Sequence, residues 1–271
     1  IQEVYPYSFA EYLQAQNILL ETNWIYKTAI RSEIIRQFNN YFYDGALPEL
    51  LLFKDKRSWL SNLYQKIFFG DLIARYTVRN VNAMRLLIKK LAESVKQPSS
   101  YTRLTHIIST TGTKVGTQTI IDYLNYAEEC WLTFSISNYA TKFVEKESNK
   151  KYYFIDNGLL NLFLFDPETS LLENMVAIQL RKKYKKQVYF YNQNVEIDFY
   201  IPEEALGIQV SYSLHDPETE KREINAFLKI SGLLNLDRMI IITKDEKRSI
   251  PIAENKSIEV IPIWEWLLAI P

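Results

Sequence analysis

The chain has 271 residues, and its 32 basic and 32 acidic side chains give a formal net charge of zero. A hydrophobic content of 47%, with 14% aromatic residues, excludes a disordered chain, and seven glycines argue against a glycine-rich nucleotide-binding fold. The length favours two or three domains rather than one core, and the zero net charge requires any basic surface to be local.

Apolar residues at helical spacing dominate residues 1–95. Comparable apolar faces occur in 60–76, in 82–95 and in 28–43, where the face consists of Ile30, Ile34, Ile35 and Phe38. No alternating strand pattern interrupts them. We therefore predict that residues 1–95 form an all-helical domain.

Residues 96–155 combine helices and strands in a different order. Two helices flank the Thr- and Gly-rich turn 109–116, and two strand-like pieces follow at 132–136 and 151–155. Helix, turn, helix and hairpin is the order of a winged helix, which we predict for this domain. The turn lacks the Gly-Lys-Ser/Thr ending of a phosphate-binding loop, so we do not expect this chain to hydrolyse a nucleotide alone.

Polar side chains at the second helix of this domain are candidates for contacting a DNA groove: Lys114, Thr117 and Gln118. The wing of the hairpin would add phosphate-neutralising cations at Lys142, Lys146, Lys150 and Lys151. The alternative interpretation is a solvated turn on a domain that serves only protein interaction.

Residues 156–271 alternate helices with strands. Helices are expected at 171–186, 218–233 and 263–270, and the strand-like pieces are 188–191, 195–201, 207–212, 239–243 and 257–261. Helices that flank mixed strands predict an α/β layer fold for this third domain.

A dense basic cluster ends the first of these helices: Arg181, Lys182, Lys183, Lys185 and Lys186. Cations at the C-terminal end of a helix are stabilised by the helix dipole without any ligand. The second interpretation is contact with a phosphate backbone, for which we single out Arg181, Lys182 and Lys183.

Three carboxylates, Glu173, Glu196 and Asp198, follow one another on a helix and the next hairpin. Glu196 and Asp198 are two residues apart on one strand, so their side chains point to the same face. Hard divalent cations prefer such oxygen ligands, and Mg²⁺ or Mn²⁺ could bind at Glu173 and Asp198. The alternative is an exposed polar face on an edge hairpin.

A series of motifs resembles the C-terminal region of a family of bacterial and archaeal AAA+-type ATPases. The segments that carry the resemblance are 5–13, FYDGALPEL at 42–50, DLIARYTVRN at 71–80, KYYFIDNGLL at 151–160, LLEN at 171–174, EIDF at 196–199 and Gln209-Val210. The resemblance implies a helical lid and connector, a winged helix, and a domain of unknown function that resembles the PD-(D/E)xK nuclease fold. It also implies ATP in an N-terminal domain that is not part of this chain.

Carried over residue by residue, the resemblance assigns Glu173 to the helix acid of the nuclease fold and Asp198 to its strand acid. Gln209-Val210-Ser211 then stands where the family has acid-x-lysine, so Gln209 replaces an acid and the lysine is absent. Lys221 on the next helix could be a migrated substitute. The fold class implied is α+β or α/β with several domains, and the nuclease-like site, Glu173, Asp198 and Gln209, is degenerate.

Three functions follow as hypotheses. The first is a module that binds duplex DNA, with weak or lost nuclease activity, driven by the ATPase domain. The second is an active metal-dependent nuclease, and the third is a regulatory module that binds a protein partner or joins ATPase subunits. The single cysteine, Cys130, favours a reducing cytoplasm. No apolar run is long enough to span a bilayer. The start at Ile1 suggests that the chain is a piece of a longer protein.

Overall fold

Helices alone make up the N-terminal part of the chain. The computed structural model describes residues 3–20, 24–139, 146, 148–253 and 256–269. Its first four α-helices are α1 (Phe9–Ala15), α2 (Thr28–Asp44), α3 (Lys56–Lys66) and α4 (Val81–Glu93), with a π-helical segment at Ile67–Ala74. The all-helical prediction for residues 1–95 is therefore confirmed for the described residues.

The helix ends follow the local sequence. Ser8 and Glu11 form a capping box at the start of α1, where each side chain bonds to the backbone N–H of the other residue. Asn80 caps α4 by accepting a hydrogen bond from the backbone of Ala83. The apolar face of α4 is buried in the main core and consists of Met84, Leu87, Ile88 and Leu91.

One mixed sheet spans the rest of the described chain. Its strands lie in the order β1-β3-β2-β4-β5-β6-β7-β9-β8. Their bounds are β1 Ser99–Ser100, β2 Thr133–Asn138, β3 Asn149–Phe154, β4 Tyr189–Asn192, β5 Glu196–Ile201, β6 Leu206–Val210, β7 Arg238–Thr243, β8 Arg248–Ala253 and β9 Lys256–Pro262. The sheet thus joins strands from both sides of residue 155, the predicted domain boundary.

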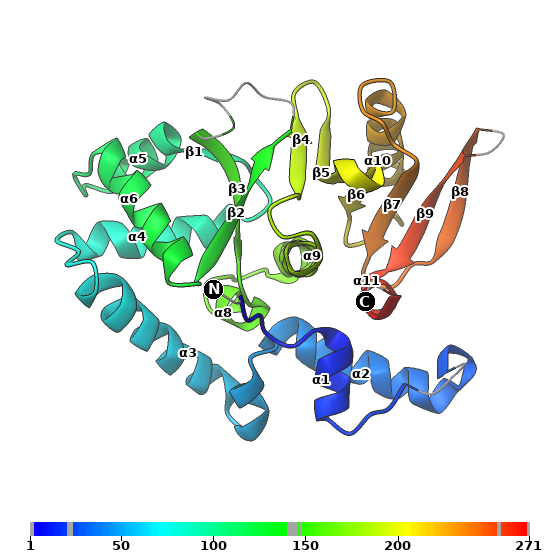
Figure 1. The fold of residues 1–271 in the computed structure, drawn as a ribbon, viewed down its shortest axis with the longest axis horizontal. Helices are drawn as coiled ribbons and strands as arrows, with labels where there is room; N and C mark the ends of the chain where they lie inside the picture. Colours follow the sequence, from blue (N-terminus) through cyan, green and yellow to red (C-terminus); the bar gives the residue numbers. More distant parts are fainter. Residues whose placement is uncertain (1–2, 21–23, 140–145, 147, 254–255, 270–271) are drawn as a thin grey trace.

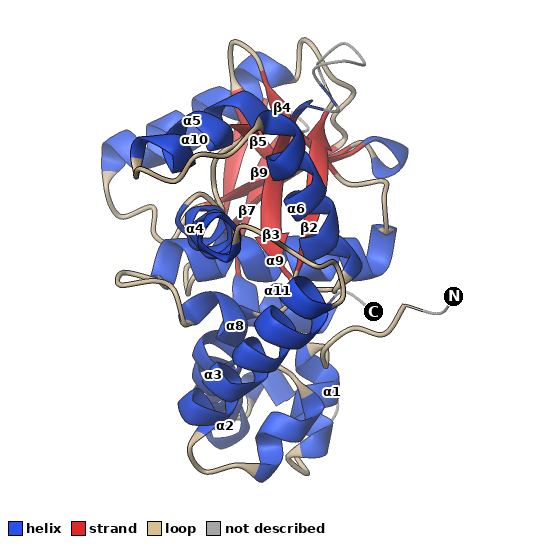
Figure 2. Ribbon diagram, turned by 90° about the vertical axis from the view of Figure 1, so that its left-hand side faces the viewer, coloured by secondary structure: helices blue, strands red, loops and turns tan. Residues whose placement is uncertain are grey.

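The part of the chain that the structure describes contains further α-helices after α4. They are α5 (Tyr101–Thr110), α6 (Thr117–Glu129), α8 (Asn157–Asn161), α9 (Glu168–Tyr184), α10 (Pro217–Ile230) and α11 (Ile263–Ala269). In Figure 1, α4, α5 and α6 gather beside β1 and β3, while β8 and β9 form the opposite edge. Figure 2 shows α1, α2 and α3 below the strands.

The two halves of the sheet meet along a short contact. The strands β2 and β4 pair in parallel over two residue pairs, Ser137 with Tyr189 and Asn138 with Phe190. The helix α9, seen end-on in Figure 1, contacts β3 in one half of the sheet and β6 in the other. Side chains from α9 can therefore meet side chains from both halves of the sheet.

Candidate functional site

A buried lysine lies among the three carboxylates that the sequence singled out. The Nζ atom of Lys151 is 3.2 Å from Oε1 of Glu173, 3.1 Å from Oε1 of Glu196 and 3.1 Å from Oδ1 of Asp198. The Lys151 side chain has no exposed surface. We call these four residues the Lys151 cluster, and its carboxylates come from α9 and β5 while its ammonium comes from β3.

Strand alternation places Lys151 in this cluster. Lys151 and Tyr153 are two residues apart on β3, so both reach the same face, and the Tyr153 hydroxyl donates to Oε1 of Glu173 at 2.8 Å. The strands β2 and β4 lie between β3 and β5 in the sheet. The side chain of Lys151 spans these two strands, and its ammonium lies 5.7 Å from the ring centroid of Phe190 on β4.

The electrostatics of the Lys151 cluster favour a charged lysine. Burial alone would lower the pKa of Lys151, but the carboxylates of Glu173, Asp198 and Glu196 raise it above its usual value. Burial also raises the pKa of Glu173, against the attraction of Lys151. Burial and the neighbouring Glu173 raise the pKa of Tyr153 well above that of an exposed tyrosine, so its hydroxyl remains a hydrogen-bond donor.

The side chain of Gln209 is hydrogen-bonded to the backbone of β5, the strand that carries Glu196 and Asp198, and is not free to bind a metal ion. Its Oε1 accepts from the backbone N–H of Asp198 at 2.8 Å. Its Nε2 donates to Oε2 of Glu223 at 2.9 Å and to the carbonyl of Glu196 at 3.3 Å. The second carboxylate oxygen of Asp198 accepts from the backbone N–H of Val210 at 2.9 Å. The predicted ligand atoms of Asp198 and Gln209 are thus already hydrogen-bonded within the chain.

These contacts decide whether the predicted residues fit a divalent cation. The Lys151 ammonium contacts one oxygen of each carboxylate. The second oxygen of Asp198 accepts from the backbone N–H of Val210, and the side-chain carbonyl of Gln209 accepts from the backbone N–H of Asp198. Within the described ranges, no three His, Cys, Asp or Glu side chains are arranged to hold a metal ion. The residues present do not fit Mg²⁺ or Mn²⁺ while Lys151 stays in place.

The predicted trio nevertheless lines one cavity. Glu173, Asp198 and Gln209 line a cavity of about 710 Å³, together with Glu196 and Glu223. Its lining also includes the cations Lys96, Arg222 and Lys229. The three residues that the sequence singled out on α9, β5 and β6 therefore lie close together.

Two lysine assignments need correction. We expected Lys151 on a DNA-facing wing, but its side chain is fully buried and cannot contact a phosphate. Lys221 is exposed on α10 and does not line the acidic cavity, so Lys151 is the lysine that reaches the acids. Ser211, which occupies the position where the resemblance implied a lysine, is buried and donates to the carbonyl of Ser213 at 3.0 Å. Lys142 lies outside the described residues.

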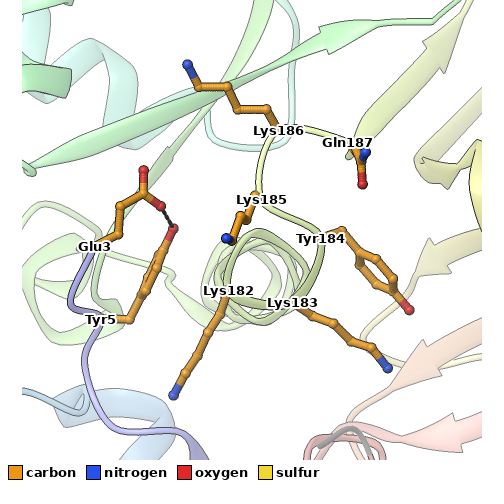
Figure 3. A pocket seen from close by; sticks show the side chains of 8 residues that line it. All are labelled: Glu3, Tyr5, Lys182, Lys183, Tyr184, Lys185, Lys186 and Gln187. Atoms are coloured by element: carbon orange, nitrogen blue, oxygen red, sulfur yellow. Dashed lines mark hydrogen bonds between the residues drawn. The ribbon is translucent and has the colours of Figure 1, made fainter. Parts of the chain in front are cut away.

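The basic end of α9 borders a second cavity. Lys182, Lys183, Lys185 and Lys186 line a cavity of about 780 Å³ with Glu3 and Tyr5, drawn in Figure 3. Lys182 also forms an ion pair with Glu11 at 2.8 Å, and this contact lowers the pKa of Glu11 to about 2. Lys182 therefore helps to hold α1 against α9, whatever else it binds.

Arg181 lies beside a third cavity. This cavity, of about 450 Å³, is lined by the cations Lys146, Lys150, Arg181 and Lys186 and by Ser135 and Ser137 of β2. The other predicted nucleic-acid residues are elsewhere. Lys114 is exposed and lines a different cavity with Thr119, Gln118 donates to Asp122, and the Thr117 hydroxyl accepts from Thr105. The two predicted sets do not share a cavity among those described.

Comparison with known proteins identifies relatives but no activity. The family described as a domain of unknown function (DUF8612) matches residues 35–170. The uncharacterised protein MJ1544 of Methanocaldococcus jannaschii is 30% identical over 98% of this chain, and an uncharacterised protein of Haemophilus influenzae is 26% identical over 98%. The chain spans 63% and 64% of the lengths of these two relatives.

Neither a solved structure nor, among the described residues, a membrane-spanning helix adds to this identification. No solved structure gives a significant match to this chain. Within the described part of the chain, no helix combines the length and the apolar character needed to cross a membrane.

Proposed function

The chain belongs to the family described as a domain of unknown function (DUF8612), and we propose from its own residues that it is the DNA-associated part of an AAA+-type ATPase. In this proposal the α/β region descends from a PD-(D/E)xK nuclease and has weak or no cleavage activity. The observation that carries it is the meeting of Glu173, Asp198 and Gln209 in one cavity, with Lys151 among the acids.

The order of elements supports a nuclease ancestry. The run α9-β4-β5-β6-α10-β7 places an acid on its first helix, an acid on its second strand and Gln209 on its third. The strands β4, β5 and β6 are antiparallel neighbours, and β7 pairs with β6 in parallel. These places follow the helix acid, the strand acid and the acid-x-lysine position that the family resemblance implies for the nuclease fold.

The middle of the chain supports a winged helix. The helices α5 and α6 flank the turn, and β2 and β3 form the following antiparallel hairpin. The short strand β1, between α4 and α5, pairs with β3 and extends this hairpin. A winged helix of this order would place Lys114, in the turn before α6, and the exposed Gln118 of α6 toward a DNA groove.

The basic cavities at the end of α9 support contact with a phosphate backbone. Lys185 and Lys186 follow α9 and line the larger cavity, and Lys186 also lines the cavity beside Arg181. Cations gathered beside two adjoining cavities can neutralise consecutive phosphates while the chain as a whole stays neutral. We therefore place the duplex along this end of α9.

Binding of labelled duplex DNA at increasing salt concentrations tests the proposal. If about four phosphates are neutralised, the affinity measured by fluorescence anisotropy should fall about 100-fold between 50 and 200 mM salt. The double variant Lys185→Glu/Lys186→Glu should abolish binding. The matched control Lys54→Glu/Lys66→Glu makes the same charge change at exposed residues in and beside α3 and should bind normally. Absence of any salt-sensitive binding would overturn the proposal.

An active nuclease is the second candidate, and one observation favours it. The side chain of Glu196 is 45% exposed, so solvent and a substrate can approach the acidic cavity. A plasmid-nicking assay with Mg²⁺ or Mn²⁺ separates the two candidates. Cleavage that Asp198→Asn removes would support the active enzyme, whereas the first proposal expects no difference between wild type and the variant.

A further inference from the structure

We propose that the Lys151 ammonium is the permanent cation of the acidic cavity, that it takes the place of a divalent metal, and that removing it opens a divalent-cation site. The proposal goes beyond DNA association, because it concerns which ion balances Glu173, Glu196 and Asp198. The Lys151 cluster is then a metal-independent joint that ties β3 to α9 and β5.

The hydrogen-bonding capacity of lysine matches the cluster. An ammonium group has three donors and no acceptor, and here three carboxylate oxygens lie within 3.1–3.2 Å of Nζ. Each carboxylate therefore supplies one acceptor, and each N–H of Lys151 has one partner. A divalent cation would need its oxygens at about 2.0–2.6 Å, and it could not enter while Nζ holds this position.

The remaining oxygen atoms do not offer a second site beside the lysine. Oδ2 of Asp198 accepts from the backbone of Val210, and Oε1 of Gln209 accepts from the backbone of Asp198. The Glu173 side chain is 4% exposed, and its Oε1 already accepts from the hydroxyl of Tyr153 as well as from Lys151. Glu196 is the exposed member of the cluster, and a single carboxylate is a weak ligand for a hard cation.

Because Lys151 is buried and covalently attached to its strand, its ammonium stays in the acidic cavity and is not replaced by a dissolved cation. Lys151 is attached to β3, whose neighbours β1 and β2 hold it from both sides, so the ammonium cannot exchange with solvent ions. Truncating the lysine would leave three carboxylates around a space that needs positive charge. A divalent cation that draws the three carboxylates inward, from 3.1–3.2 Å around Nζ to about 2.0–2.6 Å, would supply that charge.

Mn²⁺ binding to the whole chain tests the proposal without DNA. Wild type should show no binding of Mn²⁺ at 1 mM by electron paramagnetic resonance and no rise of its melting temperature. Lys151→Ala should melt at a lower temperature in EDTA and should regain at least half of the loss in 1 mM Mn²⁺. Lys150→Ala, which shortens the neighbouring lysine, is the control and should show neither Mn²⁺ binding nor a rise of its melting temperature in Mn²⁺.

Two further variants keep the test decisive. Lys151→Gln retains a hydrogen-bonding amide of similar length, so it should fold and bind Mn²⁺ even if Lys151→Ala does not fold. Adding Asp198→Asn to either variant should abolish the gain, which distinguishes this site from surface binding of Mn²⁺. Tight Mn²⁺ binding by wild type, or a folded Lys151 variant without Mn²⁺ binding, would overturn the proposal. Loss of DNA binding would overturn the proposed function and leave this inference standing.

Discussion

A Cβ atom on Gly45 would lie 2.1 Å from Oδ1 of Asp156, so these two residues fit together only because position 45 lacks a side chain. Gly45 ends α2 with φ of 84°, and the next residue, Ala46, donates its N–H to Oδ2 of Asp156 at 2.7 Å. Oδ1 of Asp156 accepts from Gly158 and Leu159 at the start of α8. The carboxylate thus joins the helical N-terminal part to the sheet.

Gly45→Ala should destabilise the chain by about 3 kcal/mol or more, because a methyl group there meets a buried carboxylate as well as a left-handed backbone. Gly112→Ala is the matched control, since Gly112 has a φ of 86° but open space around its Cα. The control should cost about 1 kcal/mol from backbone strain alone. Chemical denaturation measures both, and equal losses would show that the contact with Asp156 is not tight.

Asp156→Asn should cost about 2 kcal/mol at neutral pH, because the new amide N–H would face the N–H of Ala46. The same pair of proteins reports a pH dependence. Burial raises the pKa of Asp156 to about 6, against the hydrogen bonds from Ala46, Leu159 and Gly158. The folded state therefore holds the proton more tightly than the unfolded state, and this contribution to stability is lost as the pH rises from about 4 to about 6.

The measurement for Asp156 is the difference in unfolding free energy between wild type and Asp156→Asn across that pH range. Other titrating groups cancel in the difference. The free energy of unfolding of wild type should rise by about 2 kcal/mol relative to that of the variant as the pH falls from 6 to 4. A difference that stays constant would mean that the hydrogen bonds to Asp156 cancel the effect of its burial.

Lys244 should destabilise the fold at neutral pH. Burial lowers the pKa of Lys244 to about 8, and its Nζ lies 3.9 Å from the ring centroid of Phe42 and 4.6 Å from that of Phe38. Because the unfolded chain binds this proton more tightly, stability rises with pH between about 8 and about 10.4. Lys244→Met should therefore gain about 1 kcal/mol at pH 7, discounted for partial exposure, and the gain should shrink toward pH 10. A pH-independent gain would point to packing instead of charge.

Periodicity predicted most elements but could not predict the Lys151 cluster. The helices and the strands β4 to β7 follow local apolar patterns, whereas β8 carries Pro251 and several exposed residues, as an edge strand can, and gave no clear pattern. Lys151 resembled a wing lysine because its partners lie on α9 and β5, far along the chain. One signal in the sequence could have indicated a buried lysine. Lys151 is two residues from Tyr153 in a run of aromatic strand residues, so the two side chains lie on the same face of the strand.

The contacts of Gln209 indicate why an acid does not fit at this position. Its Nε2 donates to Oε2 of Glu223 on α10 at 2.9 Å, and Glu223 is itself buried, which raises its pKa. In Gln209→Glu a second carboxylate would take the place of that donor. Two carboxylates so close cannot both stay ionised, so the variant should lose about 3 kcal/mol at pH 7 and recover part of it in acid.

The double variant Gln209→Glu/Glu223→Gln reverses the donor and the acceptor, and it should recover about 2 kcal/mol relative to the sum of the single variants. The recovery in unfolding free energy should be incomplete, because Arg222 loses the Glu223 carboxylate that it contacts at 2.7 Å. Chemical denaturation of all four proteins gives the coupling energy. If that energy is near zero, Glu223 does not select glutamine at position 209. A large coupling would mean that placing an acid at position 209 requires changing α10 as well as β6, because the amide of Gln209 connects the two.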